Sequence, residues 1–113
     1  MRSRSLICLL AFLCCTSPIV DGPKAHALVA EQHALLLDVR TPEEFAARHL
    51  EGSINVPVDE LDARLGELES RKAGPIIVYC KSGSRAERAK IALDKAGFSK
   101  VYNLRSIDNW EKP

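Results

Sequence analysis

Apolar residues along the chain form two kinds of pattern, short continuous runs and helically spaced stripes. The continuous runs, which are typical of buried strands, lie at residues 34–40, 54–56, 76–80 and 100–104. Segments with helix signals separate these runs. Because strands and helices alternate along the chain, the pattern predicts an α/β domain with a mainly parallel central sheet and helices on both faces.

The segment after the first run carries a clear helix start. Thr41 is a suitable N-cap, Pro42 suits the first helical position, and Glu44 completes a capping box. The sequence therefore predicts that a helix starts within TPEEFAARHL, residues 41–50.

Two further helices follow from the spacing of apolar residues. Leu61, Leu65 and Leu68 lie at i, i+4 and i+7, which places them on one stripe of an amphipathic helix. Residues 85–96 carry an alanine-rich apolar face, and Gly97 is well placed to cap that helix at its C-terminal end.

The start of the chain has the layout of a secretory signal peptide. Arg2 and Arg4 precede an apolar run at residues 6–15, and small and turn-forming residues follow. The run has ten residues, whereas a transmembrane helix needs roughly 20, so we predict no permanent membrane span. A buried first helix is the alternative, but such a helix is rarely apolar on every face in a small protein. We therefore expect an exported protein, in the periplasm or otherwise outside the cytoplasm.

Cleavage of this leader is expected near residues 22–27, where an Ala-His-Ala triplet gives a small-x-small pattern. This division predicts a signal peptide at residues 1–27 and a folded domain at residues 28–113. Lipidation at Cys14 or Cys15 is a weaker alternative, because large apolar residues lie before the pair where small ones are needed.

The composition is ordinary for a soluble globular protein and limits the classes of function. The chain has 113 residues, of which 46% are hydrophobic and 27% charged, which suits one small domain. Its formal net charge is +1 with acids and bases interspersed, so we expect no nucleic-acid partner. His33 and His49 are not spaced with a Cys, Asp or Glu cluster as metal ligands are, so we predict no metal and no cofactor.

One cysteine remains once the leader is removed. Of the four cysteines only Cys80 lies beyond the predicted leader, so it cannot form an internal disulfide in an oxidising compartment. It ends the predicted strand at residues 76–80, and ligands of parallel sheets bind at the carboxyl ends of strands. Cys80 is therefore either an inert core residue or a reactive thiol.

The loop sequence CKSGSR, residues 80–85, favours the reactive thiol. A helix is predicted to begin within it, and the unpaired N–H groups and dipole of a helix N-terminus favour a negative charge. Lys81 and Arg85 add two positive charges nearby. Together these influences favour the thiolate form of Cys80, which is the nucleophile.

A glycine and two serines would complete an anion-binding cup. Gly83 permits a positive φ, so that successive backbone N–H groups converge on one point. Ser82 and Ser84 can donate further hydrogen bonds. A buried core cysteine with solvated basic neighbours is the alternative, but it does not explain the glycine, the two cations and the helix start together.

Three motifs in the same order resemble the rhodanese family. Residues 80–85 resemble its active-site loop, Cys-x-x-Gly-x-Arg; HLEGSINVP at residues 49–57 resembles a second signature; and LLLDVRTPEEF at residues 35–45 resembles its usual opening. The resemblance extends over residues 34–104. A leader followed by one short domain is similar in layout to the periplasmic phage shock protein E group.

This resemblance implies a thiosulfate sulfurtransferase. Cys80 would attack the outer sulfur of thiosulfate, release sulfite and hold the sulfur as a persulfide, cradled by the N–H groups of residues 81–85. A thiol or cyanide would then remove the sulfur, with ping-pong kinetics. Lys81 and Arg85 would attract the anionic donor and stabilise the departing sulfite; the cationic Lys81 favours thiosulfate over 3-mercaptopyruvate.

The resemblance also assigns supporting roles. Asp38, Arg40 and Glu44 match family positions that are mostly structural and tie the first strand to the loops. The partners it implies are a small anionic sulfur donor and a thiol or cyanide acceptor. We expect a monomer.

Two alternative functions remain open. Cysteine-dependent phosphatases also use a Cys-loop-Arg cup, but their loops are one residue longer than residues 81–84 and no general acid is apparent here. A non-catalytic rhodanese-like module could bind a partner, although such modules usually lack the cysteine.

One segment departs from the family pattern. After the last strand the family often has Leu-x-Gly-Gly, whereas LRSIDNW at residues 104–110 has no glycine and reaches Trp110 one residue early. The loop that faces the active site is therefore expected to differ in shape, which bears on the choice of acceptor. We also expect Trp110 to fold back onto the core.

Overall fold

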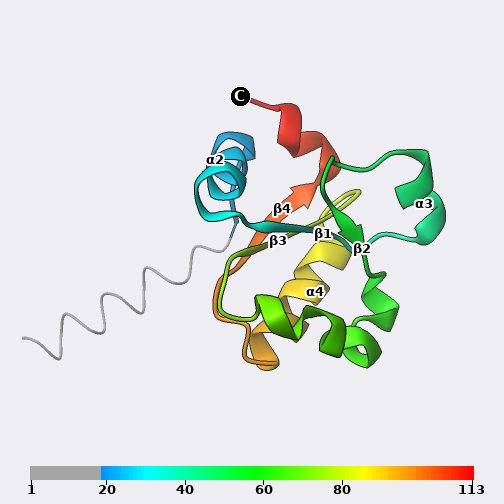
Figure 1. The fold of residues 1–113 in the computed structure, drawn as a ribbon. Coiled ribbons are helices and arrows are strands. Elements are labelled where there is room, and N and C mark those ends of the chain that lie inside the picture. Colours follow the sequence, from blue (N-terminus) through cyan, green and yellow to red (C-terminus); the bar gives the residue numbers. More distant parts are fainter. Residues whose placement is uncertain (1–18) are drawn as a thin grey trace, which may run out of the picture.

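The computed structural model describes residues 19–113 (Figure 1). Most of the predicted leader, including the cysteines considered for lipidation, lies outside the described residues. Among residues 19–113, no helix combines the length and the apolar character that crossing a bilayer requires.

Four strands form one sheet in the order β2-β1-β3-β4, and every neighbouring pair is parallel. The strands are β1 (Leu35–Asp38), β2 (Ile54–Asn55), β3 (Ile76–Cys80) and β4 (Val101–Ser106). The sheet confirms the predicted parallel α/β architecture. It also places β3, the strand that ends at Cys80, between β1 and β4.

One face of the sheet is covered by α4 (Ser84–Lys95). Val78 and Cys80 of β3 lie in one buried apolar cluster with Ala89 and Leu93 of this helix. Alternate residues of a strand point to opposite faces, so Ile77 and Tyr79, on either side of Val78, point to the other face of the sheet.

The opposite face is covered by α2 (Gly22–Gln32) and by the C-terminal 3₁₀ helix η3 (Ile107–Glu111), as Figure 1 shows. Leu28 of α2 shares a second buried cluster with Ile77 of β3, and Trp110 packs against it. Helices therefore lie on both faces of the sheet, and the predicted return of Trp110 to the core is confirmed.

Two of the predicted helix signals, the capping box at Thr41 and the glycine at the end of residues 85–96, lie at helix ends in the structure. Helix α3 (Pro42–Ala47) begins with the full capping box, in which the Thr41 hydroxyl accepts from the Glu44 backbone and the Glu44 carboxylate accepts from the Thr41 backbone. Helix α4 ends just before Gly97, whose φ of 94° is the left-handed conformation that glycine tolerates best.

The leucine stripe does not form the predicted amphipathic α-helix. The structure has two 3₁₀ helices there, η1 (Val58–Glu60) and η2 (Asp62–Arg71). Leu61 and Leu68 are buried and Leu65 is partly buried, so the apolar contacts form without the regular helix. The glycine beside Leu65 lowers the α-helical propensity of the segment, and tertiary packing decides its shape.

The predicted cleavage range, residues 22–27, lies inside α2. Asp21 caps the start of this helix, and Ala25 is completely buried in the second cluster. Just before the helix, the Val20 N–H donates to the carbonyl of Asn103 in β4 at 3.0 Å. The position of the cut stays a prediction. Val20, Asp21 and Ala25, which a cut after residue 27 would remove, are part of the fold.

Candidate active site

Cys80 is positioned by the end of β3 and the start of α4. Its Sγ accepts two backbone hydrogen bonds, from the N–H of Gly83 at 3.0 Å and from the N–H of Ala86 at 3.3 Å. Both donors belong to the N-terminal turn of α4, where N–H groups have no partner within the helix and carry partial positive charge. This environment suits a sulfur that bears negative charge.

The conformation of Gly83 makes this cradle possible. Its φ is 114°, which confirms the predicted positive φ and which side chains rarely tolerate. Gly83 is the N-cap residue of α4 and has no side chain to bond the first turn. The sulfur of Cys80 takes that place, because it accepts from the third residue of the helix as an N-cap oxygen does.

Cys80 is fully buried, with none of its surface reaching solvent. By contrast, Lys81, Ser82 and Ser84 are exposed around the loop. These three side chains therefore face approaching solutes, while the backbone of the loop faces the sulfur.

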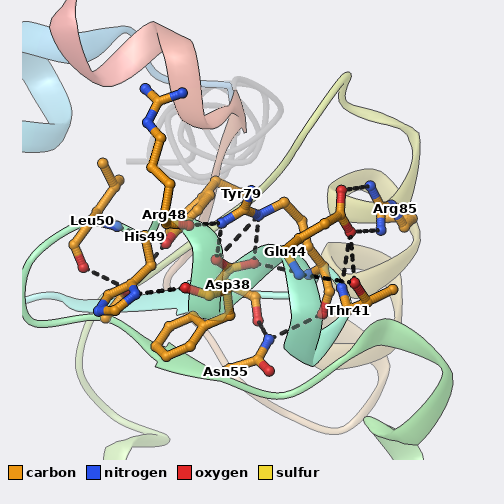
Figure 2. Close-up of polar contacts among 12 residues, drawn as sticks. Asp38, Thr41, Glu44, Arg48, His49, Leu50, Asn55, Tyr79 and Arg85 are labelled. Atoms are coloured by element: carbon orange, nitrogen blue, oxygen red, sulfur yellow. Dashed lines mark hydrogen bonds and ion pairs between the residues drawn. The ribbon is translucent and has the colours of Figure 1, made fainter.

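Arg85 is held by a carboxylate that the sequence did not connect to it. Its guanidinium forms a two-pronged contact with Glu44 of α3, Nη1 to Oε1 at 2.8 Å and Nη2 to Oε2 at 3.2 Å (Figure 2). The hydrogen bond from Arg85, with a second from the Thr41 backbone, lowers the pKa of Glu44 from 4.5 to about 2. In this arrangement Glu44 compensates much of the Arg85 charge.

Arg85 nevertheless lies within electrostatic reach of the sulfur. The pKa of Arg85 is raised, first by its hydrogen bond to Glu44 and further by the charges of Glu44 and Cys80. The structure thus places Arg85 in the first turn of α4 and directs its donors to Glu44 of α3. Its role toward a bound anion stays a prediction.

A buried ion pair fixes the end of β1 beside the loop. Arg40 binds Asp38 through Nε to Oδ1 at 2.9 Å and Nη2 to Oδ2 at 2.6 Å, and it also donates to the carbonyl of Arg48. Asn55 donates to the backbone carbonyls of Asp38 and Arg40 (Figure 2). The expected structural role of Asp38 and Arg40 is confirmed by these contacts.

Tyr79 connects the strand of the cysteine to the loop after α3. Its hydroxyl accepts from the N–H of Leu50 at 3.1 Å and lies 3.0 Å from the Ser53 hydroxyl. Burial raises the pKa of Tyr79, so the phenol stays neutral and can keep both contacts. The residue next to Cys80 is therefore anchored on the far face of the sheet.

Three features of the site were missed by the sequence analysis. The N–H of Ala86 lies one residue beyond the predicted cradle, and Glu44 was expected only to support the first strand. The third is Arg105, which occupies the x position of the segment where Leu-x-Gly-Gly is missing, and the missing glycines could have drawn attention to this segment. Its φ is 73°, and a Cβ added to Gly83 would lie 3.4 Å from its Nε.

Residues 19–113 contain no group of three or more His, Cys, Asp or Glu side chains placed to hold a metal ion. The site they do contain is a buried sulfur that accepts from two backbone N–H groups, beneath a loop whose Lys81, Ser82 and Ser84 side chains are exposed. Such a cradle can hold a negatively charged sulfur or a small anion.

Comparison with known proteins relates this geometry to a family. A model of the family described as "Rhodanese-like domain" matches residues 23–113. Thiosulfate sulfurtransferase PspE of Escherichia coli (strain K12) is 31% identical over 77 residues, which cover 68% of this chain and 74% of that protein. The solved structure of the human single-domain sulfurtransferase TSTD1 superposes with a TM-score of 0.75 and 27% identity, covering 85% of this chain and 97% of that one.

Another relative has no described activity. The uncharacterized protein YibN of Escherichia coli (strain K12) is 35% identical over 94 residues, which cover 81% of this chain. The match spans 66% of the length of YibN, so that relative is longer than the region it shares with this chain. The family match contains the Cys80 cradle, both helical layers and the whole sheet. The chain belongs to the rhodanese-like domain family.

Proposed function

We propose that this protein is a thiosulfate sulfurtransferase that carries sulfur as a persulfide on Cys80 and delivers it to a thiol or to cyanide. The observation that carries the proposal is the pair of hydrogen bonds from the α4 N-terminus to Sγ. The similarity to the thiosulfate sulfurtransferase PspE supports the choice of donor.

The first half-reaction uses the cysteine thiolate as nucleophile. The thiolate bonds to the outer sulfur of thiosulfate, the sulfur–sulfur bond of thiosulfate breaks, and sulfite leaves with the bonding electron pair. Charge is conserved, because a thiolate and a dianion give a persulfide anion and sulfite dianion. The N–H groups of Gly83 and Ala86 stabilise the negative sulfur before the transfer.

The burial of Cys80 imposes a condition on this chemistry. Because none of the residue is exposed, the loop formed by residues 81–83 must open slightly for thiosulfate to reach the sulfur. Lys81 and Ser82 are exposed on that loop and are positioned to meet the incoming anion. Their contribution is electrostatic attraction and hydrogen bonding to the sulfonate end of the donor.

The same burial favours one alternative function, a rhodanese-like binding module without chemistry. In that case the Cys80 sulfur serves only as the cap of α4, and a partner binds elsewhere on the surface. The two functions differ in whether thiosulfate ever modifies Cys80.

Incubation with thiosulfate followed by intact-mass measurement separates them. The proposal requires a mass increase of one sulfur atom, loss of that increase on addition of cyanide, and formation of thiocyanate. Cys80→Ser is the matched control, since serine can keep the cap but forms no persulfide. An unmodified wild-type protein, or thiocyanate formation undiminished in Cys80→Ser, contradicts the proposal.

Export to the periplasm is a second part of this proposal, and it rests on the leader alone. The arginines, the apolar run and the small residues that follow form a signal-peptide pattern. Cell fractionation followed by N-terminal sequencing of the recovered protein tests both the compartment and the cut. Recovery of the uncut chain from the cytoplasm contradicts this part without affecting the sulfur chemistry.

A further inference from the structure

A cavity of about 400 Å³ lies beside the Cys80 loop on the side of β4. We name it the β4-side cavity; it is lined by Ile19, Ser82, Gly83, Ser84, Glu87, Asn103 and Arg105. Its volume is within the range of roughly 300–1,000 Å³ that is common for small-molecule sites. It is also about 13 times the volume of about 30 Å³ that one water takes in the liquid, which is more room than thiosulfate needs.

The cavity shares a wall with the sulfur cradle. Gly83 lines the cavity, and its N–H donates to the Sγ of Cys80 at 3.0 Å. Arg105 pairs across the sheet with the residue before Cys80, so it lies next to the end of β3. Gly83 therefore borders both the cavity and the sulfur, and the opening of residues 81–83 that thiosulfate requires would also connect the cavity with Cys80.

The backbone of Arg105 is held in an unusual conformation. Its φ of 73° is in the left-handed region, which costs free energy for residues other than glycine. The Arg105 N–H donates to the Asn103 side-chain oxygen at 2.8 Å, and the Asn103 amide donates to Glu87 at 3.2 Å. Asn103 is buried, so this chain of contacts fixes the direction in which Arg105 leaves the strand.

The charge of Arg105 is available to a ligand. Within residues 19–113, no carboxylate lies at ion-pair distance from Arg105, in contrast to Arg85, which is paired with Glu44. A guanidinium presents a planar fork of donors that fits a carboxylate through two hydrogen bonds. The Arg105 side chain lies close to the loop, since a Cβ added to Gly83 would be 3.4 Å from Nε and 3.8 Å from Nη2.

A second charged residue, Glu87, limits further the chemical class of ligand that the cavity can bind. Glu87 lines the same cavity, and its negative charge disfavours a small dianion such as thiosulfate. A molecule with a carboxylate at one end and an ammonium nearby satisfies both Arg105 and Glu87.

We propose that the β4-side cavity binds the sulfur acceptor, and that this acceptor is an amino-acid-type thiol whose carboxylate pairs with Arg105. The inference rests on the persulfide function proposed for Cys80. In the second half-reaction the acceptor thiolate bonds to the outer persulfide sulfur, and the bond between that sulfur and Sγ breaks. The acceptor thiol gives its proton to the outer sulfur of the persulfide anion, so RS⁻ and Cys–S–SH then give R–S–SH and the Cys80 thiolate, and no added oxidant or reductant is needed.

The test compares two acceptors that differ mainly in the carboxylate. Cysteine has it, and cysteamine lacks it. The protein is first loaded with thiosulfate, its one-sulfur mass increase is measured, excess donor is removed, and each thiol is titrated in single-turnover discharge of the persulfide. The wild-type protein is expected to discharge to cysteine at lower concentration than to cysteamine.

The variants Arg105→Asn and Arg105→Gly both suit a positive φ, so the loop keeps its shape. We expect each to reduce the preference for cysteine over cysteamine about tenfold, as for loss of a charge-assisted hydrogen bond. Arg88→Asn is the matched control, because Arg88 is also exposed and basic but pairs with Asp59 and does not line the cavity. It should leave the preference unchanged.

The outcomes separate this inference from the function on which it rests. If the wild-type protein gains no sulfur from thiosulfate, the proposed function fails. If the persulfide forms but the preference is the same in wild type and both Arg105 variants, the cavity inference is overturned. An equal loss of preference in Arg88→Asn also overturns it, since general attraction by positive charge then accounts for the effect.

Discussion

At the scale of single residues, the sulfur of Cys80 has a structural task beside any chemical one. The N-cap residue of α4 is a glycine without a side chain, and Sγ accepts the N–H groups that an N-cap oxygen normally satisfies. These donors lie at buried positions, Gly83 and Ala86. Leaving a buried donor unpaired costs free energy, so the cysteine contributes to the stability of the loop it serves.

Two substitutions of Cys80 should therefore differ in stability, although both remove the nucleophile. Cys80→Ser retains an acceptor of the kind preferred at N-caps, whereas Cys80→Ala leaves both N–H groups without one. We expect the free energy of unfolding to be lower by about 1–2 kcal/mol in Cys80→Ala than in Cys80→Ser. Urea unfolding of the two variants measures this difference, and coincident curves would show that the sulfur is no cap.

Glu44 gives a prediction about pH. Its folded pKa is about 2 and its ordinary value 4.5. A lowered pKa stabilises the fold fully above the unfolded value, and this contribution is lost as the pH falls from about 4.5 to about 2. Glu44→Gln should thus unfold more easily than wild type at neutral pH, by no more than about 1 kcal/mol because the pair with Arg85 is partly exposed.

The gap between Glu44→Gln and wild type should close as the pH approaches 2. Thermal unfolding across this range measures it. Glu43→Gln is the control, because Glu43 lies in the same first turn of α3 and is not paired with Arg85. A gap that stays constant with pH would assign the effect to packing instead of charge.

At the scale of elements, the features set by neighbouring residues could be predicted from the sequence, and those set by distant ones could not. The capping box at Thr41, the strand that ends at Cys80 and the positive φ of Gly83 all depend on local sequence, and the structure confirms them. The contact of Glu44 with Arg85 joins residues 41 positions apart. Local sequence spacing cannot predict such a pair, because only the folded structure brings α3 close to the start of α4.

Packing also explains the other differences between the predicted and the observed structure. The leucine segment has helical spacing, yet its burial against the sheet is achieved by 3₁₀ turns. Arg105 has a side chain where local preference calls for glycine, and its conformation depends on Asn103 and Glu87. In each case tertiary contacts override the preference that a single sequence expresses.

Helix α2 gives a prediction about the beginning of the folded domain. Residues 19–27 include Val20 and Ala25, which are buried, and His26, whose ring stacks on Trp110 with centroids 3.6 Å apart. A protein that begins at residue 28 keeps too little of α2 to form a helix. We expect it to be less stable than one that begins at residue 19 by about 3 kcal/mol or more, from lost apolar burial.

Urea unfolding of these two proteins measures the difference. The same reasoning predicts that, if export includes cleavage, the cut leaves Val20 and all of α2 in the mature chain, because Val20 and Ala25 belong to the second buried cluster. N-terminal sequencing of exported protein checks the position. Equal unfolding midpoints, together with a mature chain that begins at residue 28, would contradict the structural role of α2.

At the scale of the whole molecule, the two helical layers use almost all of the large apolar side chains. Within residues 19–113, the large hydrophobic residues that remain exposed are Ile19, Ile54 and Ile91. They lie on different elements: one precedes α2, one is in β2 and one is in α4. The described surface therefore exposes only three large apolar side chains, whereas stable association usually needs a larger contiguous apolar patch.

From this distribution we expect the folded protein to be a monomer. Ile54 is in β2, which forms an edge of the sheet, but β2 has only two residues and offers little backbone for pairing with a second copy. Light scattering coupled to size-exclusion chromatography should give the mass of one chain at micromolar concentration, in wild type and in Ile91→Lys alike. A dimer mass in wild type that falls to the monomer mass in Ile91→Lys would contradict the expectation and would locate the interface on α4.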